Sequence, residues 1–178
     1  MKNKDFVIEL LAKGDVVLEI KKKLSDLLAV IPELESMINF EHQHPHHHLN
    51  VWEHTMLALS YAVNKLEIRL ALLLHDIGKP YSYQQDGDIR HYKGHAEVSC
   101  EMAKTILKRL NFDESIVNNV CQIIKRHDIP LNEKDFISNP KRARDVFEVQ
   151  RCDALAHNPL YNQKRLAYID KISNLIKG

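Results

Sequence analysis

The sequence predicts an all-α fold, and three observations lead to this class. Five glycines and six prolines make up about 6% of the 178 residues, against a usual share of roughly 12%, which disfavours a turn-rich sheet protein. Apolar residues recur at intervals of three and four along most of the chain, which is the spacing of an amphipathic helix. No stretch of strand length alternates cleanly between polar and apolar residues. The length of the chain suits a single domain.

Two helices and a polar loop are expected at the start of the chain. Amphipathic patterns over residues 6–11 and 16–31 are separated at Gly14, and Pro32 ends the second pattern or begins the next helix. A polar, histidine-rich segment over residues 41–49 follows and predicts a loop. We expect the two helices to form a cap on the main domain.

The central helices have the clearest boundaries. Asn50 and Glu53 resemble a capping box, so a helix is expected to begin at Val51 and to continue to about Asn64. The next helix, over residues 66–77, is apolar on nearly all sides and ends at a glycine and a proline. Such a pattern is typical of a buried central helix.

The second half of the chain continues the helical pattern after one interruption. An Asp-Gly pair within residues 81–93 predicts a loop with a small hairpin. Four more helices are expected, over residues 95–110, 114–127 and 141–156 and after Asn158-Pro159. The chain thus divides into an N-terminal helical segment over residues 1–40 and a main domain over residues 41–178.

Composition excludes several classes of function. The 25 Lys and Arg residues nearly balance the 24 Asp and Glu residues, which argues against a polyanion-binding surface and disfavours broad RNA binding. The longest apolar run, Leu70–Leu74, is far too short for a membrane span, and charged residues interrupt the N-terminus where a signal peptide would need an apolar core. Three cysteines without a CxxC pair indicate reduced thiols. We therefore expect a cytoplasmic protein with no membrane partner.

Histidine is unusually frequent, with eleven residues in the chain. Four histidines and two aspartates fall on the apolar sides of the expected helices or at the end of the apolar one: His54, His75, Asp76, His95, His127 and Asp153. Residues spaced three, four or seven apart share a helix face, so we expect these six side chains to point into the interior.

A metal ion explains this set better than separate hydrogen bonds do. A single histidine on an apolar face is more often a core residue that makes one hydrogen bond. A buried aspartate is harder to explain, because desolvating a carboxylate costs several kcal/mol. His75 and Asp76 are adjacent on a helix and are not expected to face each other. A divalent cation would satisfy all six groups together, and imidazoles with carboxylates suit a first-row transition metal.

These residues lie in motifs that resemble a known family. In chain order they are His54, HDIGKP with His75 and Asp76, GHAEVS with His95, RHD with His127, and CDALAHNP with Asp153. The ordered set, over residues 44–159, resembles the HD superfamily of metal-dependent phosphohydrolases. It is most similar to the HD domain of bacterial CCA-adding tRNA nucleotidyltransferases. A nucleotidyltransferase domain does not accompany it in 178 residues, so we expect a stand-alone HD domain, a helical bundle around a buried metal site.

The resemblance also implies a role for each residue. One metal ion would be held by His54, His75, Asp76 and Asp153, and Asp76 would bridge to a second ion held by His95 and His127. The sequence does not distinguish Fe, Mn, Zn, Ni, Co or Mg. Asp76 and Lys79 are the candidate catalytic residues. Phosphate binding is assigned to Lys79 and, as second choices, to Arg126, Arg142 and Arg144. One of residues 46–48 is expected to face the metal cleft, while His91 and His157 are expected to be peripheral.

The resemblance implies a phosphodiesterase or phosphatase that acts on nucleotides or other small phosphorylated molecules. Candidate substrates are 2′,3′-cyclic nucleotides and 2′-nucleotides. The second enzymatic interpretation is a 5′-nucleotidase or a dinucleoside polyphosphate hydrolase. A metal-bearing signalling or RNA-binding module without turnover is the rival from another class, and the complete ligand set disfavours it.

Overall fold

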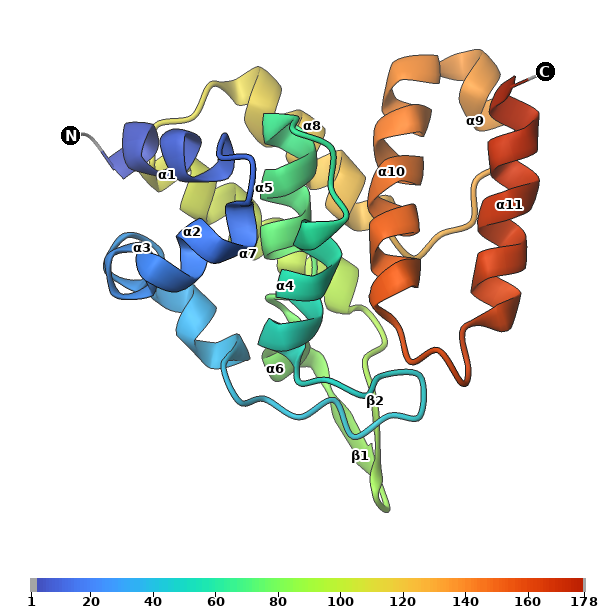
Figure 1. Cartoon of the computed structure of the whole chain (residues 1–178), viewed down its shortest axis with the longest axis horizontal. Helices are drawn as coiled ribbons and strands as arrows, with labels where there is room; N and C mark the ends of the chain where they lie inside the picture. The colour runs from blue at the N-terminus through green and yellow to red at the C-terminus, as the bar shows by residue number, and fades with distance from the viewer. Residues whose placement is uncertain (1–2, 178) are drawn as a thin grey trace.

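Helices make up most of the chain in the computed structural model, which describes residues 3–177, and the all-α prediction is confirmed (Figure 1). The α-helices of the described residues are α1 (Asn3–Leu11), α2 (Val16–Lys22), α3 (Leu24–Val30), α4 (Val51–Ser60), α5 (Leu66–Leu74), α6 (Lys79–Ser82), α7 (His95–Arg109), α8 (Glu114–Arg126), α9 (Glu133–Ser138), α10 (Pro140–Ala156) and α11 (Gln163–Lys177). A 3₁₀ helix, η1 (Pro32–Met37), follows α3. No helix within residues 3–177 is both long and apolar enough to cross a membrane.

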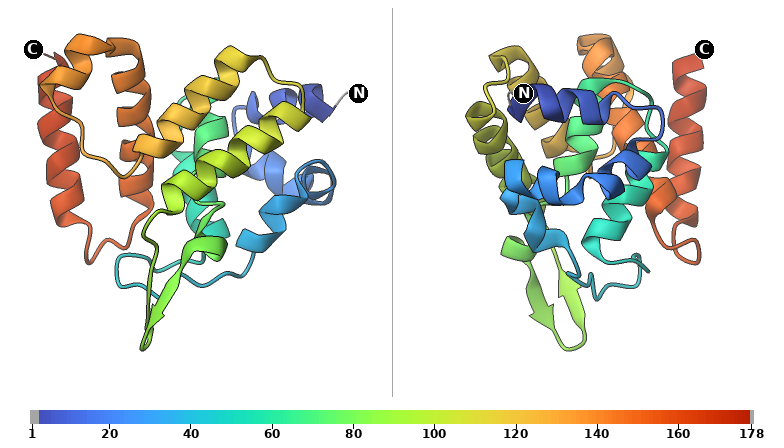
Figure 2. Two further views of the ribbon diagram at one scale, coloured as in Figure 1. Left: turned by 180° about the vertical axis from the view of Figure 1, so that it is seen from behind. Right: turned by 60° about the vertical axis from the view of Figure 1, so that its left-hand side comes forward.

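Helix α5 forms the centre of the core, as its sequence predicts. Its residues from Ile68 to Leu74 are all buried, and it packs against α4, α8 and α10. The N-terminal helices share this core, and the buried Arg69 attaches them to it by donating to the carbonyl oxygens of Leu11 and Lys13 at 2.5 and 2.7 Å. The domain boundary at residue 40 stays a prediction. Figure 2 shows α10 and α11 side by side at the other end of the molecule.

The prediction of one helix over residues 16–31 is wrong in one respect, because two helices, α2 and α3, occupy this range. Lys23 lies between α2 and α3 with φ −115° and ψ 25°, and its amide donates to both Glu19 and Ile20. Helix α9 is absent from the prediction because none of its residues is buried, so no apolar stripe marks it. The capping box that begins it joins Asn132 and Asp135.

The last helix begins later than predicted. Asn158 does not cap α11, because its amide and side chain donate to the carbonyl oxygens of His46 and Pro45 at 2.9 and 3.1 Å. The chain therefore first attaches to the histidine-rich loop, and α11 starts at Gln163. Helix α4 likewise ends at Ser60 rather than at residue 64.

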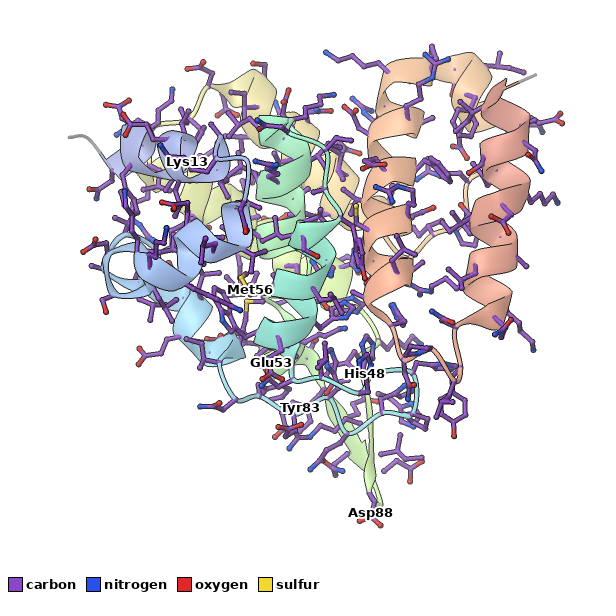
Figure 3. The ribbon with its side chains drawn as sticks, in the orientation of Figure 1. Lys13, His48, Glu53, Met56, Tyr83 and Asp88 are labelled. Atoms are coloured by element: carbon purple, nitrogen blue, oxygen red, sulfur yellow. The ribbon has the colours of Figure 1, made fainter. Side chains whose placement is uncertain are left out.

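The expected small hairpin is confirmed. Strands β1 (Gln84–Asp86) and β2 (Ile89–His91) pair antiparallel, and Gly87 has a positive φ of 56° in the turn between them. Figure 3 places Asp88 at the tip of the hairpin, which projects from the helices beside the loop that carries His48. Arg90 fastens the hairpin to this loop by donating to the carbonyl oxygen of Gln43 at 2.9 Å.

Gly78 allows the turn after α5 to approach α7 closely. A Cβ atom at this position would lie 2.6 Å from the amide nitrogen of Ser99 and 2.8 Å from the carbonyl oxygen of His95. We expect Gly78→Ala to lower the free energy of unfolding by about 2 kcal/mol, because backbone atoms must shift. Gly14→Ala is the control, since nothing lies within 4 Å of a Cβ there. Urea denaturation measures both, and equal losses would contradict the packing argument.

Candidate metal centre

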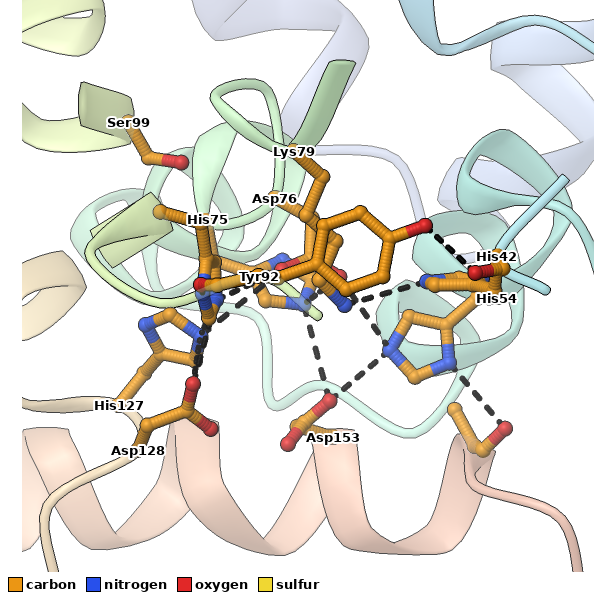
Figure 4. A network of polar contacts seen from close by, with 12 residues as sticks. His42, His54, His75, Asp76, Lys79, Tyr92, Ser99, His127, Asp128 and Asp153 are labelled. Carbon is orange, nitrogen blue, oxygen red and sulfur yellow. Dashed lines mark hydrogen bonds and ion pairs between the residues drawn. The ribbon is translucent and has the colours of Figure 1, made fainter. Parts of the chain in front are cut away.

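The six residues that the sequence selects lie together at the ends and along the inner sides of the helices. Figure 4 labels all of them except His95. His54 lies on α4 and Asp153 on α10, while His95 begins α7. The other three lie just beyond helix C-termini: His75, Asp76 and His127. Each side chain belongs to a residue that is at most 8% exposed. The expectation that these six side chains are buried in the interior is therefore confirmed.

Asp76 belongs to two groups of residues whose potential ligand atoms lie close enough together to bind one metal ion. His54, His75 and Asp76 offer ligand atoms within 4.8 Å of one another, and so do Asp76, His95 and His127. His54 Nε2 lies 2.9 Å from Asp153 Oδ1, which adds the second carboxylate to the first group. Asp76 is therefore the residue that the two groups have in common.

All four imidazoles have the tautomer that a metal ligand needs. Each Nδ1 lies near a backbone carbonyl oxygen: that of Ala156 for His54 (3.2 Å), Leu72 for His75 (2.7 Å), Tyr92 for His95 (2.8 Å) and Ile124 for His127 (2.6 Å). Because a carbonyl oxygen can only accept, each Nδ1 carries the hydrogen and Nε2 keeps its lone pair in the neutral ring. Such backbone hydrogen bonds orient histidine ligands in metalloproteins.

Several polar atoms at the centre have no partner that would satisfy them. His75 Nε2 and Asp76 Oδ1 are buried and make no hydrogen bond within the described part of the chain. The Nε2 atoms of His95 and His127 lie 3.1 Å apart, although in neutral rings both would present lone pairs. Buried polar groups are nearly always satisfied, so these atoms fit a divalent cation.

One expectation about this cluster is wrong. His75 and Asp76 were expected not to face each other, yet His75 Nε2 lies 3.2 Å from Asp76 Oδ2. Helix α5 ends at Leu74 and a turn follows it, so the divergence of adjacent helical side chains does not apply.

Neighbouring charges shift the pKa values of Asp76 and His75 in opposite directions. Burial raises the pKa of Asp76, but the positive charges of His75 and Lys79 outweigh it and hold this pKa well below its ordinary value. Burial lowers the pKa of His75, but the interactions with the carboxylates of Asp76 and Asp153 together outweigh burial and raise this pKa to about 10. The carboxylate of Asp76 is therefore ionised and can act as a ligand.

Lys79 is held at the centre by two partners. Its Nζ donates to Asp76 Oδ2 at 2.8 Å and to His42 Nε2 at 3.1 Å. His42 Nδ1 donates to the carbonyl oxygen of Leu49 at 2.8 Å, so its Nε2 is free to accept from the ammonium group. The sequence did not single out His42 from the dense histidine cluster, which offers no helical phase.

A cavity of about 690 Å³ opens onto this cluster. Five cationic side chains line it: Lys79, Lys93, Lys125, Lys164 and Arg165. His44, His46 and His47 also line the cavity, whereas His48 does not, so two of the residues 46–48 face it where one was expected. His91 lines it from the hairpin and is exposed.

Two charged residues of the cavity were missed by the sequence argument. Asp128 Oδ2 lies 3.2 Å from His95 Nε2 and 3.5 Å from His127 Nε2. Arg165 donates to Asp153 Oδ2 and lies 3.3 Å from Asp128 Oδ1. Asp128 could have been predicted as a site residue, because it directly follows His127 in the sequence. Arg165 could not have been predicted, because the sequence of its helix has an ordinary amphipathic pattern.

His157 is not peripheral, contrary to expectation. It is buried, and its ring centroid lies 4.5 Å from that of His47. It directly follows α10, where the chain turns back toward the histidine-rich loop.

The three arginines proposed for phosphate binding do not reach the cavity. Arg126 donates to Asp135 Oδ1 at 2.7 Å, and it lines a separate hollow of about 100 Å³ with Arg142. Arg144 is exposed and does not line either cavity. Adjacency to His127 and Asp153 in the sequence was misleading, because neighbouring helix positions point in different directions. Of the cationic side chains that line the cavity, Lys79 and Arg165 contact the carboxylates of Asp76 and Asp153.

Comparisons with known proteins agree with the motif order. The profile of the HD domain family matches residues 46–174. The CC-adding tRNA nucleotidyltransferase of Thermus thermophilus is 32% identical over 145 residues, which cover 78% of this chain and 32% of that protein. The A-adding tRNA nucleotidyltransferase of Deinococcus radiodurans is 35% identical over 96 residues, or 50% of this chain and 22% of that protein. The chain thus spans about a third or less of these relatives.

Proposed function

Because this chain belongs to the HD domain family, of the metal-dependent phosphohydrolase type, we propose that it hydrolyses phosphate esters of nucleotides. The observation that carries the proposal is the common orientation of His54, His75, His95 and His127. Each gives its Nδ1 hydrogen to a backbone carbonyl and turns Nε2 toward two buried carboxylates. A core histidine needs only one hydrogen bond, whereas four so oriented form a ligand set.

We propose two divalent ions at this set. His54, His75, Asp76 and Asp153 would hold the first, while Asp76, His95 and His127 would hold the second. Bound ions of this kind lower the pKa of a water nucleophile and stabilise charge on phosphoryl oxygens. Asp76 would keep both positions together, and its place in two ligand groups supports this role.

Lys79 and Arg165 would bind the phosphate of the substrate. Both line the cavity, and both already pair with a carboxylate of the ligand set. A substrate phosphate could replace those carboxylates as the partner once cations bind them. The cavity volume of about 690 Å³ lies in the ordinary range of small-molecule sites, roughly 300–1,000 Å³.

The proposed substrates are 2′,3′-cyclic nucleotides and 2′-nucleotides. The relatives are named for adding nucleotides to tRNA, which supports a nucleotide or the nucleotide end of an RNA as the ligand. A 5′-nucleotidase, a dinucleoside polyphosphate hydrolase and a binding module without turnover are the alternatives.

The test measures metal content and turnover together. We expect the protein loaded with Mn²⁺ or Co²⁺ to hydrolyse 2′,3′-cyclic AMP and 2′-AMP, and metal removal by a chelator to stop both reactions. 3′-AMP, 5′-AMP and a dinucleoside tetraphosphate complete the panel. Turnover of only the last two substrates would favour the alternative enzymes. Full metal occupancy without turnover of any substrate would overturn the hydrolase proposal.

A further inference from the structure

The carboxylate of Asp128 faces the two imidazoles of the proposed second metal position. Its Oδ2 atom lies 3.2 Å from His95 Nε2 and 3.5 Å from His127 Nε2. Figure 4 shows this carboxylate beside the imidazole of His127. Both Nε2 atoms keep a lone pair in the neutral rings, so neither gives a hydrogen to the carboxylate. Three atoms with lone pairs therefore face one another at the wall of the cavity.

The spacing of these atoms matches that of ligands around one ion. His95 Nε2 and His127 Nε2 lie 3.1 Å apart, and Asp76 Oδ1 lies 3.4 Å from the first and 3.9 Å from the second. Ligands that lie about 2.1 Å from a tetrahedral ion are about 3.4 Å from one another. Asp128 Oδ2, at 3.2 and 3.5 Å from the two nitrogens, has the distances of a fourth ligand.

The other ligand atoms of this position are not used by the first position. Asp76 Oδ1 is buried and makes no hydrogen bond within the described part of the chain. The second oxygen of the same carboxylate, Oδ2, faces His75 and Lys79 instead. His95 and His127 each give the Nδ1 hydrogen to a backbone carbonyl, which leaves Nε2 for an ion. The two positions therefore use different oxygens of Asp76 and have no other residue in common.

Arg165 holds Asp128 in this orientation. Its guanidinium group donates to Asp128 Oδ1 at 3.3 Å and also to Asp153 Oδ2. The other oxygen of each carboxylate is left for a metal position. Asp153 Oδ1 lies 2.9 Å from His54 Nε2 in the first position, and Asp128 Oδ2 makes the corresponding contact in the second. Carboxylates that bind metals are commonly held by such hydrogen bonds to neighbouring groups.

Asp128 also balances the charge of a second cation. Without it, the second position has Asp76 as its one carboxylate, and the first position shares that residue. A buried ion is costly unless groups of opposite charge compensate for it. With Asp128, each position has two imidazoles and two carboxylates.

We propose that Asp128 is a ligand of the second metal position, together with Asp76, His95 and His127. The inference rests on the proposed function, because it concerns one of the two ions assigned there. Two imidazoles and two carboxylates suit a divalent first-row ion such as Mn²⁺, Fe²⁺ or Co²⁺. The alternative is an ion pair between Asp128 and a protonated His95, in which the carboxylate would compete with the cation.

Equilibrium dialysis of the metal-free full chain against Co²⁺, with elemental analysis, tests the inference. The wild-type protein is expected to bind two ions. In Asp128→Asn, the Kd of one ion should rise by about 100-fold or more, because even the loss of an outer contact to a ligand costs roughly 10- to 100-fold. The Kd of the other ion should stay close to its wild-type value. Unchanged affinities for both ions, or a tighter second ion, would overturn the inference.

Glu97→Gln is the matched control. Glu97 lies on α7, lines the same cavity and is exposed, so this variant removes one negative charge there without changing a proposed ligand. Both ions are expected to bind with wild-type affinities. If Glu97→Gln weakens the second ion as much as Asp128→Asn does, the effect comes from the charge of the cavity and the inference is wrong.

The visible absorption of bound Co²⁺ distinguishes a ligand from a charge nearby. Asp128→Ala is measured at Co²⁺ concentrations that fill both positions, and the absorption of the second ion should change because water replaces the carboxylate. An unchanged spectrum would place Asp128 outside the coordination sphere and overturn the inference. The side chain of Asp128 is 36% exposed, so its removal should leave the fold intact, and circular dichroism of the metal-free variant checks this.

The outcomes distinguish this inference from the proposed function. If the wild-type protein binds two ions and Asp128→Asn binds both equally well, Asp128 is not a ligand and the proposed function stays intact. A wild-type protein that binds one ion would overturn the second position and this inference with it, while turnover by the same sample would still support hydrolysis. A wild-type protein that binds no ion would overturn both proposals.

Discussion

Asp76→Asn is expected to lower kcat/KM for the substrate hydrolysed best by about 10³-fold or more. Asp76 is shared by the first and second proposed metal positions, and an amide carries no charge to hold two cations together. The nearly equal volume of asparagine leaves the packing of the turn after α5 unchanged. Steady-state kinetics and elemental analysis of the same samples measure the change, and we expect fewer bound ions as well as slower turnover.

Asp145→Asn is the matched control. Asp145 is also a buried aspartate, 7% exposed, but it pairs with Lys65 at 2.6 Å and does not line the cavity. Its loss should reduce stability without changing kcat/KM more than about twofold. Turnover of Asp76→Asn within tenfold of the wild-type rate would remove Asp76 from the site.

Arg165→Ala is expected to lower kcat/KM by about 10- to 100-fold, which corresponds to a lost hydrogen bond between charged groups. The guanidinium group lies between Asp153 and Asp128 at the wall of the cavity. We expect most of the effect in KM, because a phosphate in the cavity would lose a bidentate partner. Arg165→Lys should recover part of the loss, since lysine keeps the charge but not the planar geometry.

Arg142→Ala tests whether phosphate is bound by Arg165, which the structure favours, or by Arg142, which the sequence favoured. Arg142 was chosen because it lies on the same helix as Asp153, but it is exposed and lines the small separate hollow. Its kcat/KM should stay within about twofold of wild type. A larger effect at Arg142 than at Arg165 would restore the sequence-based choice and contradict the cavity geometry.

The positions that helical phase could predict were those on long amphipathic or apolar helices. His54, His127 and Asp153 share faces with apolar neighbours, and burial confirms each of them. Phase could not indicate which carbonyl oxygens would receive the Nδ1 hydrogens. For His54 that partner is Ala156, 102 residues away.

The parts that could not be predicted depend on tertiary contacts between polar segments. Helix α9 buries none of its residues, and His42 lies in a loop without regular spacing. Arg165 enters the site only because α11 packs beside α10. A charged residue on a surface-like helix gives no sequence signal for such a contact.

The hydrogen bonds from Asn158 to Pro45 and His46 have a consequence for the order of folding. Asn158 lies 113 residues after Pro45 and 112 residues after His46 in the sequence. The contact of His54 with Asp153 spans 99 residues. Closing loops of this length lowers the entropy of the chain, and the formation of local helices does not compensate for this loss. The metal-binding pocket should therefore form at the last step, when α10 docks on α4. During refolding, cation binding would then lag behind the formation of the helices.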